Sequence, residues 1–123
     1  MRPGDRKPIP TVAETVNRAA AICDPDAGDE VVSALVEGFE DDERPATAVP
    51  DPAAELEGTV TAIDAEGDSA AARMTAACAV WLSTNMDQAD DPEHVLREAA
   101  RLVFEGEPPV EVRQWLADQG VEA

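Results

Sequence analysis

The chain has 123 residues, 44% of them hydrophobic, and 27 acidic residues against nine lysines and arginines give it a formal net charge of −18. That length suffices for one domain whose core needs no disulfide or metal, and no apolar run approaches the roughly 18 residues of a membrane-spanning helix. The opening stretch, MRPGDRKPIP, lacks the apolar segment of a secretory signal. We therefore expect a protein of the cytoplasm or of a virion, without contact to a membrane.

The excess of acidic over basic residues indicates the salt concentration at which the chain folds. Lys7 is the only lysine, and the other eight bases are arginines. In dilute buffer this charge opposes a compact state, whereas at about 1 M salt the Debye length shrinks to roughly 3 Å and the repulsion is screened. The apolar residues recur periodically, which argues against a disordered acidic chain. The composition is typical of a halophilic archaeon or its virus; an ordinary acidic bacterial protein is the alternative.

Start and stop signals predict the elements in chain order. A basic, proline-rich arm covers residues 1–10. Thr11 and Glu14 have the spacing of a capping box, and apolar residues follow at helical intervals as far as Cys23. A second helix is predicted over 31–39, where valine, leucine and phenylalanine recur on one face.

A connector over residues 41–50 separates the second helix from the third. Its part 44–50 is predicted to be extended, because each proline disfavours a helical conformation in the residue before it. The third helix begins at Asp51-Pro52, and Gly67 stops it. The fourth helix, 70–85, starts after a cap at Asp68 or Ser69.

The fourth helix is the most apolar element, and alanine fills most of the positions outside its stripe of larger side chains. A helix this apolar is normally central to a bundle or buried against a partner. The fifth helix opens at Asp91-Pro92, and Gly106 is the predicted residue just past its end.

The sixth helix, near 109–120, ends with Gly120 and Val121, which is typical of a Schellman cap. No stretch shows the alternation of apolar and polar residues that is typical of a strand at the surface. The predicted fold class is therefore all-α: a compact bundle of about five or six short helices, forming a single domain over residues 11–123.

The acidic stretch 24–30, DPDAGDE, resembles a calcium loop at first sight. Counted from Asp24, however, the loop needs a ligand at the position of Gly28, a glycine at Asp29 and a closing glutamate at Leu35. Asp-Pro recurs at 24–25, 51–52 and 91–92, each time before a helical pattern. Because aspartate caps a helix and proline suits its first position, we interpret all three as helix starts, and predict no metal site.

Few residues offer catalytic chemistry. His94 is the only histidine, and Cys23 and Cys78 each fall on an apolar helical stripe, as small buried residues do. No phosphate loop, dinucleotide fingerprint or nucleophile elbow occurs. We predict no catalytic residue, cofactor, metal or small-molecule substrate; an enzyme using Cys78 or His94 is the lesser alternative.

In the segment 92–120 two predicted helices are joined by a short turn, as in a helix-turn-helix. This arrangement suggests a DNA-associated regulator as a second hypothesis. Its second helix carries Arg113 as the only base, against Glu111 and Asp118. Phosphate contacts supply most non-specific affinity for DNA, so an acidic helix argues against this function, although high salt screens the repulsion as well.

The leading hypothesis is a non-enzymatic structural or interaction subunit of a larger assembly, for example a virion connector or adaptor, with protein partners or further copies of itself. The arm holds three bases, Arg2, Arg6 and Lys7, which could contact an acidic neighbour. Trp81 and Trp115 are the large anchors of the chain; core positions are expected for both, and an exposed one would be an interface candidate.

Overall fold

The computed structural model describes residues 10–26, 28–66, 69–105 and 107–121. Within these ranges it contains α-helices and two short 3₁₀ turns but no strand, which confirms the predicted all-α bundle. The elements are α1 (Val12–Cys23), α2 (Glu30–Phe39), η2 (Ala46–Ala48), α3 (Pro52–Ile63), α4 (Ala70–Asn85), η3 (Met86–Gln88), α5 (Pro92–Phe104) and α6 (Val110–Asp118). The first nine residues of the basic arm lie outside the described ranges.

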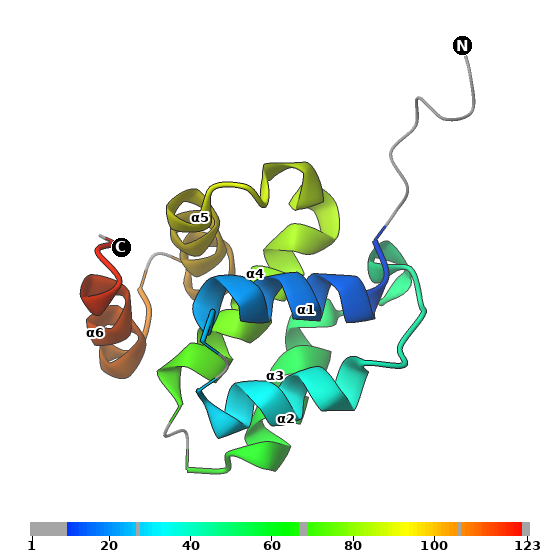
Figure 1. Cartoon of the computed structure of the whole chain (residues 1–123), viewed down its shortest axis with the longest axis horizontal. Coiled ribbons are helices and arrows are strands. Elements are labelled where there is room, and N and C mark those ends of the chain that lie inside the picture. Colours follow the sequence, from blue (N-terminus) through cyan, green and yellow to red (C-terminus); the bar gives the residue numbers. More distant parts are fainter. Residues whose placement is uncertain (1–9, 27, 67–68, 106, 122–123) are drawn as a thin grey trace.

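Helix α4 is the centre of the bundle. It packs on α1, α2, α3, α5 and α6, and 11 of its 16 residues are buried. In Figure 1, α1 and α2 lie side by side on the near face, with α3 and α4 behind them, while α5 and α6 occupy the left end. The predicted central position of the most apolar helix is confirmed.

Helices α1 to α5 each begin where a side chain accepts a free backbone amide of the first turn, whereas α6 begins after Pro109 without a side-chain cap. Thr11 and Glu14 form the predicted capping box: the Glu14 N–H donates to Thr11 Oγ1 at 3.1 Å, and the Thr11 N–H donates to Glu14 Oε1 at 3.1 Å. Ser69 caps α4, accepting the Ala72 N–H at 3.0 Å. Asp51 and Asp91 cap α3 and α5 with proline next to them, as predicted.

The interpretation of Asp24-Pro25 as a helix start is wrong. Asp24 ends α1, and its carboxylate accepts the N–H groups of Gly28 at 3.0 Å and Asp29 at 2.9 Å. Asp29 is the residue that caps α2, through the amides of Val31 and Val32. Because Asp24 directly follows α1, its carboxylate serves the turn that must come before the next helix can start.

The two caps are linked across the fold. Ser69 Oγ donates to Asp29 Oδ2 at 2.8 Å, while Asp29 Oδ1 accepts the first amides of α2. One carboxylate therefore ties the start of α2 to the start of α4, two helices that are distant in sequence but in contact in the bundle.

Three further details differ from expectation. The segment 44–50 is not extended throughout, since it contains η2, and the Ala46 N–H donates to the Pro10 carbonyl at 2.8 Å, which ties the connector to the start of α1. Helix α5 ends at Phe104, and Glu105 takes the left-handed conformation (φ 54°) that glycine usually supplies. The chain must turn there, because two prolines at 108–109 cannot prolong α5. Helix α3 ends at Ile63, earlier than the predicted stop at Gly67; Gly67 itself and Gly106 lie outside the described residues.

The end of α6 is as predicted. Gly120 has a φ of 80°, its N–H donates to the Ala117 carbonyl at 3.0 Å, and the Val121 N–H donates to the Leu116 carbonyl at 2.9 Å. These are the two hydrogen bonds of a Schellman motif. Val121 and Leu116 are both buried, and they supply the hydrophobic contact that accompanies the motif.

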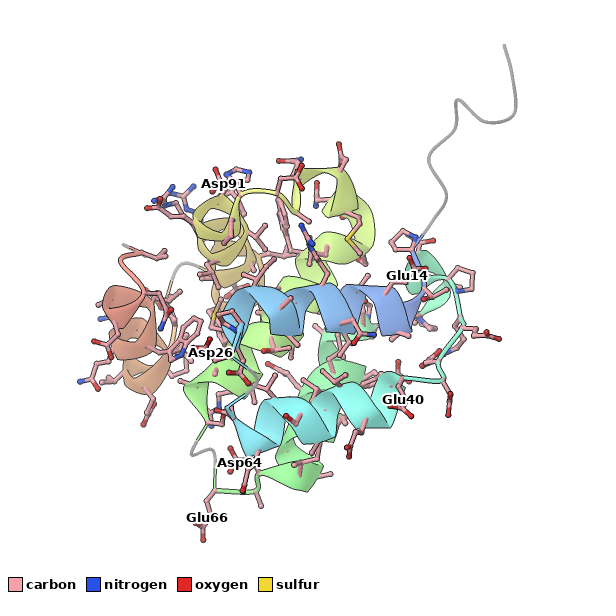
Figure 2. The ribbon with its side chains drawn as sticks, in the orientation of Figure 1. Glu14, Asp26, Glu40, Asp64, Glu66 and Asp91 are labelled. Carbon is pink, nitrogen blue, oxygen red and sulfur yellow. The ribbon has the colours of Figure 1, made fainter. Side chains whose placement is uncertain are left out.

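No charged side chain is buried in the described part of the chain. The buried polar side chains there are all hydroxyls: Thr15, Ser69, Thr75 and Ser83. The exposed labelled acids, among them Glu14, Glu40 and Glu66, lie at the periphery of the ribbon (Figure 2). Repulsion between such exposed charges is the kind that dissolved salt screens.

Candidate protein-interaction groove

A groove of about 390 Å³ lies between α3, α4 and the turn from α5 to α6. It is lined by Glu57, Val60 and Thr61 of α3, Arg73 and Ala76 of α4, Phe104 and Pro109. The α3 residues are one helical turn apart, as are the two α4 residues, so each helix presents one face to the groove.

The floor of this groove is apolar, and its rim carries charge. Val60 and Ala76 are buried in the core, and Phe104 is half-buried against it. Glu57 is exposed on the α3 side, and Arg73 is half-buried on the α4 side. Such a combination accepts an apolar group and orients it through a few polar contacts.

Arg73 differs from most arginines of the described chain. Arg18, Arg44, Arg97 and Arg101 each form an ion pair with an aspartate or glutamate. Within the described residues, neither Arg73 nor the exposed Arg113 of α6 has such a partner. In a chain with 27 acids, a half-buried guanidinium left unpaired beside an apolar groove is a free donor for a carboxylate.

Arg44 shows what a paired guanidinium does in this protein. It donates to Asp42 at 2.6 Å and to Glu55 at 3.0 Å, and so joins the connector to α3. The side-chain hydrogen bond from Arg44 lowers the pKa of Asp42, because it favours the charged form of that carboxylate. Arg73 offers an incoming carboxylate the same donors.

Two exposed apolar side chains stand close in sequence to residues that line the groove. Ile63, 39% exposed, lies one helical turn beyond Val60 on α3, and Val110, 63% exposed, directly follows Pro109. Both side chains therefore leave apolar area exposed to solvent.

The tryptophans differ in their accessibility. Trp81 is only 8% exposed, and its ring meets the His94 ring edge to face at a centroid distance of 5.6 Å. Trp115 of α6 is half-buried, so part of its surface remains available to a partner. The other predicted partner-binding residues, Arg2, Arg6 and Lys7, lie outside the described residues.

His94 and Cys78, the residues considered for catalysis, lie in different surroundings. His94 lies at the start of α5, where its Nε2 and Gln88 Oε1 are 3.0 Å apart. Cys78 is fully buried in α4, and its Sγ lies 3.7 Å from Cys23 Sγ. The hydrogen bond to Cys23 and burial raise the pKa of the Cys78 thiol, so it stays protonated at neutral pH. Across the described ranges, no three His, Cys, Asp or Glu side chains gather to hold a metal ion.

The helix pair considered for DNA binding is present as α5 and α6. Glu111, Arg113 and Asp118 are all exposed, so the outward surface of α6 carries the acids as well as its single base. The electrostatic argument against phosphate contact therefore applies to the folded surface too.

The groove was not predicted from the sequence, although one signal pointed to it. Arg73 is the only charged residue of the segment 70–85. An arginine in an otherwise uncharged central helix needs either a partner or an exit to the surface. That signal identifies Arg73 alone, because Glu57, Phe104 and Pro109 join it only through the packing of α3 and the turn after α5.

No protein-family model, curated protein or solved structure matches this chain. None of the helices in the described ranges combines the length and the apolar character that crossing a bilayer would demand.

Proposed function

We propose that this protein is a non-enzymatic interaction subunit of a larger assembly in a halophilic archaeon or its virus, for example a virion connector or adaptor. Its docking surface is the groove between α3, α4 and the turn after α5. The partner is a protein segment, from another subunit or a second copy of this chain, that inserts an apolar side chain and presents a carboxylate to Arg73.

The observation that carries this proposal is Arg73, which has no ion-pair partner among the described residues and lies beside an apolar floor in a protein with a net charge of −18. Concentrated salt screens charges more than a few ångströms apart but weakens a direct, hydrogen-bonded ion pair much less. Arg73 can therefore supply specificity in brine, while Val60, Phe104 and the neighbouring Ile63 and Val110 supply apolar area.

The acidic surface fits the same function. At molar salt the repulsion between two acidic subunits is screened, so apolar contacts can hold them together; at low salt the subunits repel each other. We expect the assembly to dissociate as salt is removed, in contrast to a complex held mainly by exposed ion pairs, which salt weakens.

The test compares two charge reversals with the same chemistry. Arg73→Glu places a second acid at the groove and is expected to weaken association about tenfold or more, because the partner carboxylate then meets a like charge. Arg113→Glu makes the same change at an exposed residue of α6 that does not line the groove, and is expected to leave association within about twofold. Sedimentation equilibrium in molar KCl measures both, with circular dichroism as the check on folding.

Equal weakening by the two variants, or by neither, would remove the groove from the proposal. A gel-shift series from low to molar salt tests the DNA-binding alternative, since an adaptor gives no specific band. Inertness of Cys23 and Cys78 to alkylation in the folded state removes the enzyme alternative that uses a thiol.

A further inference from the structure

Two cysteines that are 55 residues apart in the chain meet inside the fold. Cys23 is the last residue of α1, and Cys78 lies in the middle of α4. Their Sγ atoms are 3.7 Å apart, both are free thiols, and their residues are 5% and 0% exposed. We infer that Cys23 and Cys78 are a disulfide-forming pair, so that an oxidant can lock α1 onto α4 inside each subunit.

The geometry favours a bond within the chain. The sulfur atoms must approach from 3.7 Å to about 2.05 Å, and rotation of the two side chains contributes to that approach. Cys23 can move further toward Cys78 than a residue in the middle of a helix could, because the next residue, Asp24, has already left the helical conformation (φ −142°). No acid or base is buried in the described core, so the closing sulfurs displace no charge there.

The position of each thiol suggests the order of events. Cys23 adjoins the turn between α1 and α2, beside a hollow of about 410 Å³ that Asp24 and Pro25 help to line. Cys78 is enclosed in the central helix and retains its proton. An oxidant therefore reaches Cys23, the less buried of the two thiols, first, and Cys78 acts as the resolving thiol.

The chemistry balances with a peroxide as oxidant. The Cys23 thiol gives up its proton, its sulfur attacks one oxygen of hydrogen peroxide, and the O–O bond breaks; the departing hydroxide takes up that proton and leaves as water, while Cys23 becomes a sulfenic acid. The Cys78 sulfur then attacks the Cys23 sulfur, the S–O bond breaks, and a second water leaves with the thiol proton. In sum two thiols lose two electrons and two protons, and one peroxide becomes two waters.

The bond would constrain more than two side chains. It closes a loop that contains α2, η2 and α3, and it joins the C-terminal end of α1 to the helix on which α1 packs. A loop of this length restricts the unfolded chain strongly, and a rise in Tm of about 10 °C is expected for a domain of this size. The protein would thereby acquire a more stable form under oxidising conditions.

The experiment uses the full chain, folded in molar KCl, treated with hydrogen peroxide and then quenched with catalase. Thiols are counted after denaturation, and the intact mass is measured with and without reductant. We expect two thiols to disappear, the mass to fall by two hydrogens in a monomeric chain, and Tm to rise by about 10 °C and return with dithiothreitol.

Matched controls separate this bond from other oxidation. Cys23→Ala and Cys78→Ala each leave one thiol, and each should show no mass loss of two hydrogens and no reversible rise in Tm. The wild-type thiol count stands even if a variant fails to fold. Persistence of both thiols in the folded chain, oxidation that adds oxygen instead of removing hydrogen, or a bond found only between chains would overturn the inference.

Discussion

Helices α4 and α6 show how differently two parts of one small bundle use their residues. Helix α4 has a single charged residue among 16 and contacts every other α-helix, whereas α6 has three charged residues among nine and packs chiefly on α4. Eleven residues of α4 are buried, against two of α6. The interior helix thus determines the fold, and the outer helix contributes mainly exposed residues.

The largest expected effect comes from a cavity in α4. Leu82 is fully buried, and Leu82→Ala should lower the free energy of unfolding by about 3–5 kcal/mol, because neighbours from several helices cannot collapse into the space together. Denaturant unfolding in molar KCl measures the loss. A cost below about 1 kcal/mol would contradict the central role of α4.

Leu116→Ala makes the corresponding cavity in α6. Leu116 is also fully buried, but a peripheral helix can shift to fill the space, so the expected loss is about 2 kcal/mol. Hydrogen exchange separates the two regions: this variant should speed exchange mainly in α6, whereas Leu82→Ala should speed it in every helix. Equal loss of protection in α1 and α6 would show that the two helices unfold as one unit.

The cap that links α2 to α4 should have a smaller effect. Asp29→Ala removes the acceptor for two amides and for Ser69 Oγ, and we expect a loss of about 1–2 kcal/mol. Asp26→Ala in the same turn is the control, because Asp26 is exposed and should change stability by less than about 0.5 kcal/mol. Similar losses from both changes would contradict a specific role for the cap.

The smallest expected effect is a gain. Glu105 holds a left-handed conformation that costs an L-residue about 1 kcal/mol or more, and Glu105→Gly should raise Tm by about 2 °C after the entropy cost of glycine is subtracted. Glu105→Ala retains the strain and should give no comparable gain. A thermal melt of the three proteins side by side checks this.

Local patterns predicted most of the fold. Capping residues and apolar periodicity placed all six helices, and the Gly120–Val121 pair correctly indicated the Schellman cap. The prediction that Asp24 starts a helix was wrong because its sequence neighbours resemble those of Asp51 and Asp91. Only its position directly after α1 gives Asp24 another role.

Contacts between residues that are distant in sequence could not be predicted from local patterns, because they depend on how the helices pack. Nothing near Cys23 or Cys78 in the sequence indicates that the two meet, since their proximity depends on how α1 lies across α4. In the same way the groove combines residues from α3, α4 and the turn after α5, and the absence of a partner for Arg73 in the described chain is a property of the whole surface.

The most direct test of the proposed interaction function is the molar mass of the purified wild-type protein by light scattering in molar KCl. We predict a mass that is a multiple of the 13.0 kDa chain, or a complex with a co-purifying protein, and a fall toward one chain as salt is removed. A single 13.0 kDa chain in molar salt, folded and without a partner, would contradict the proposal.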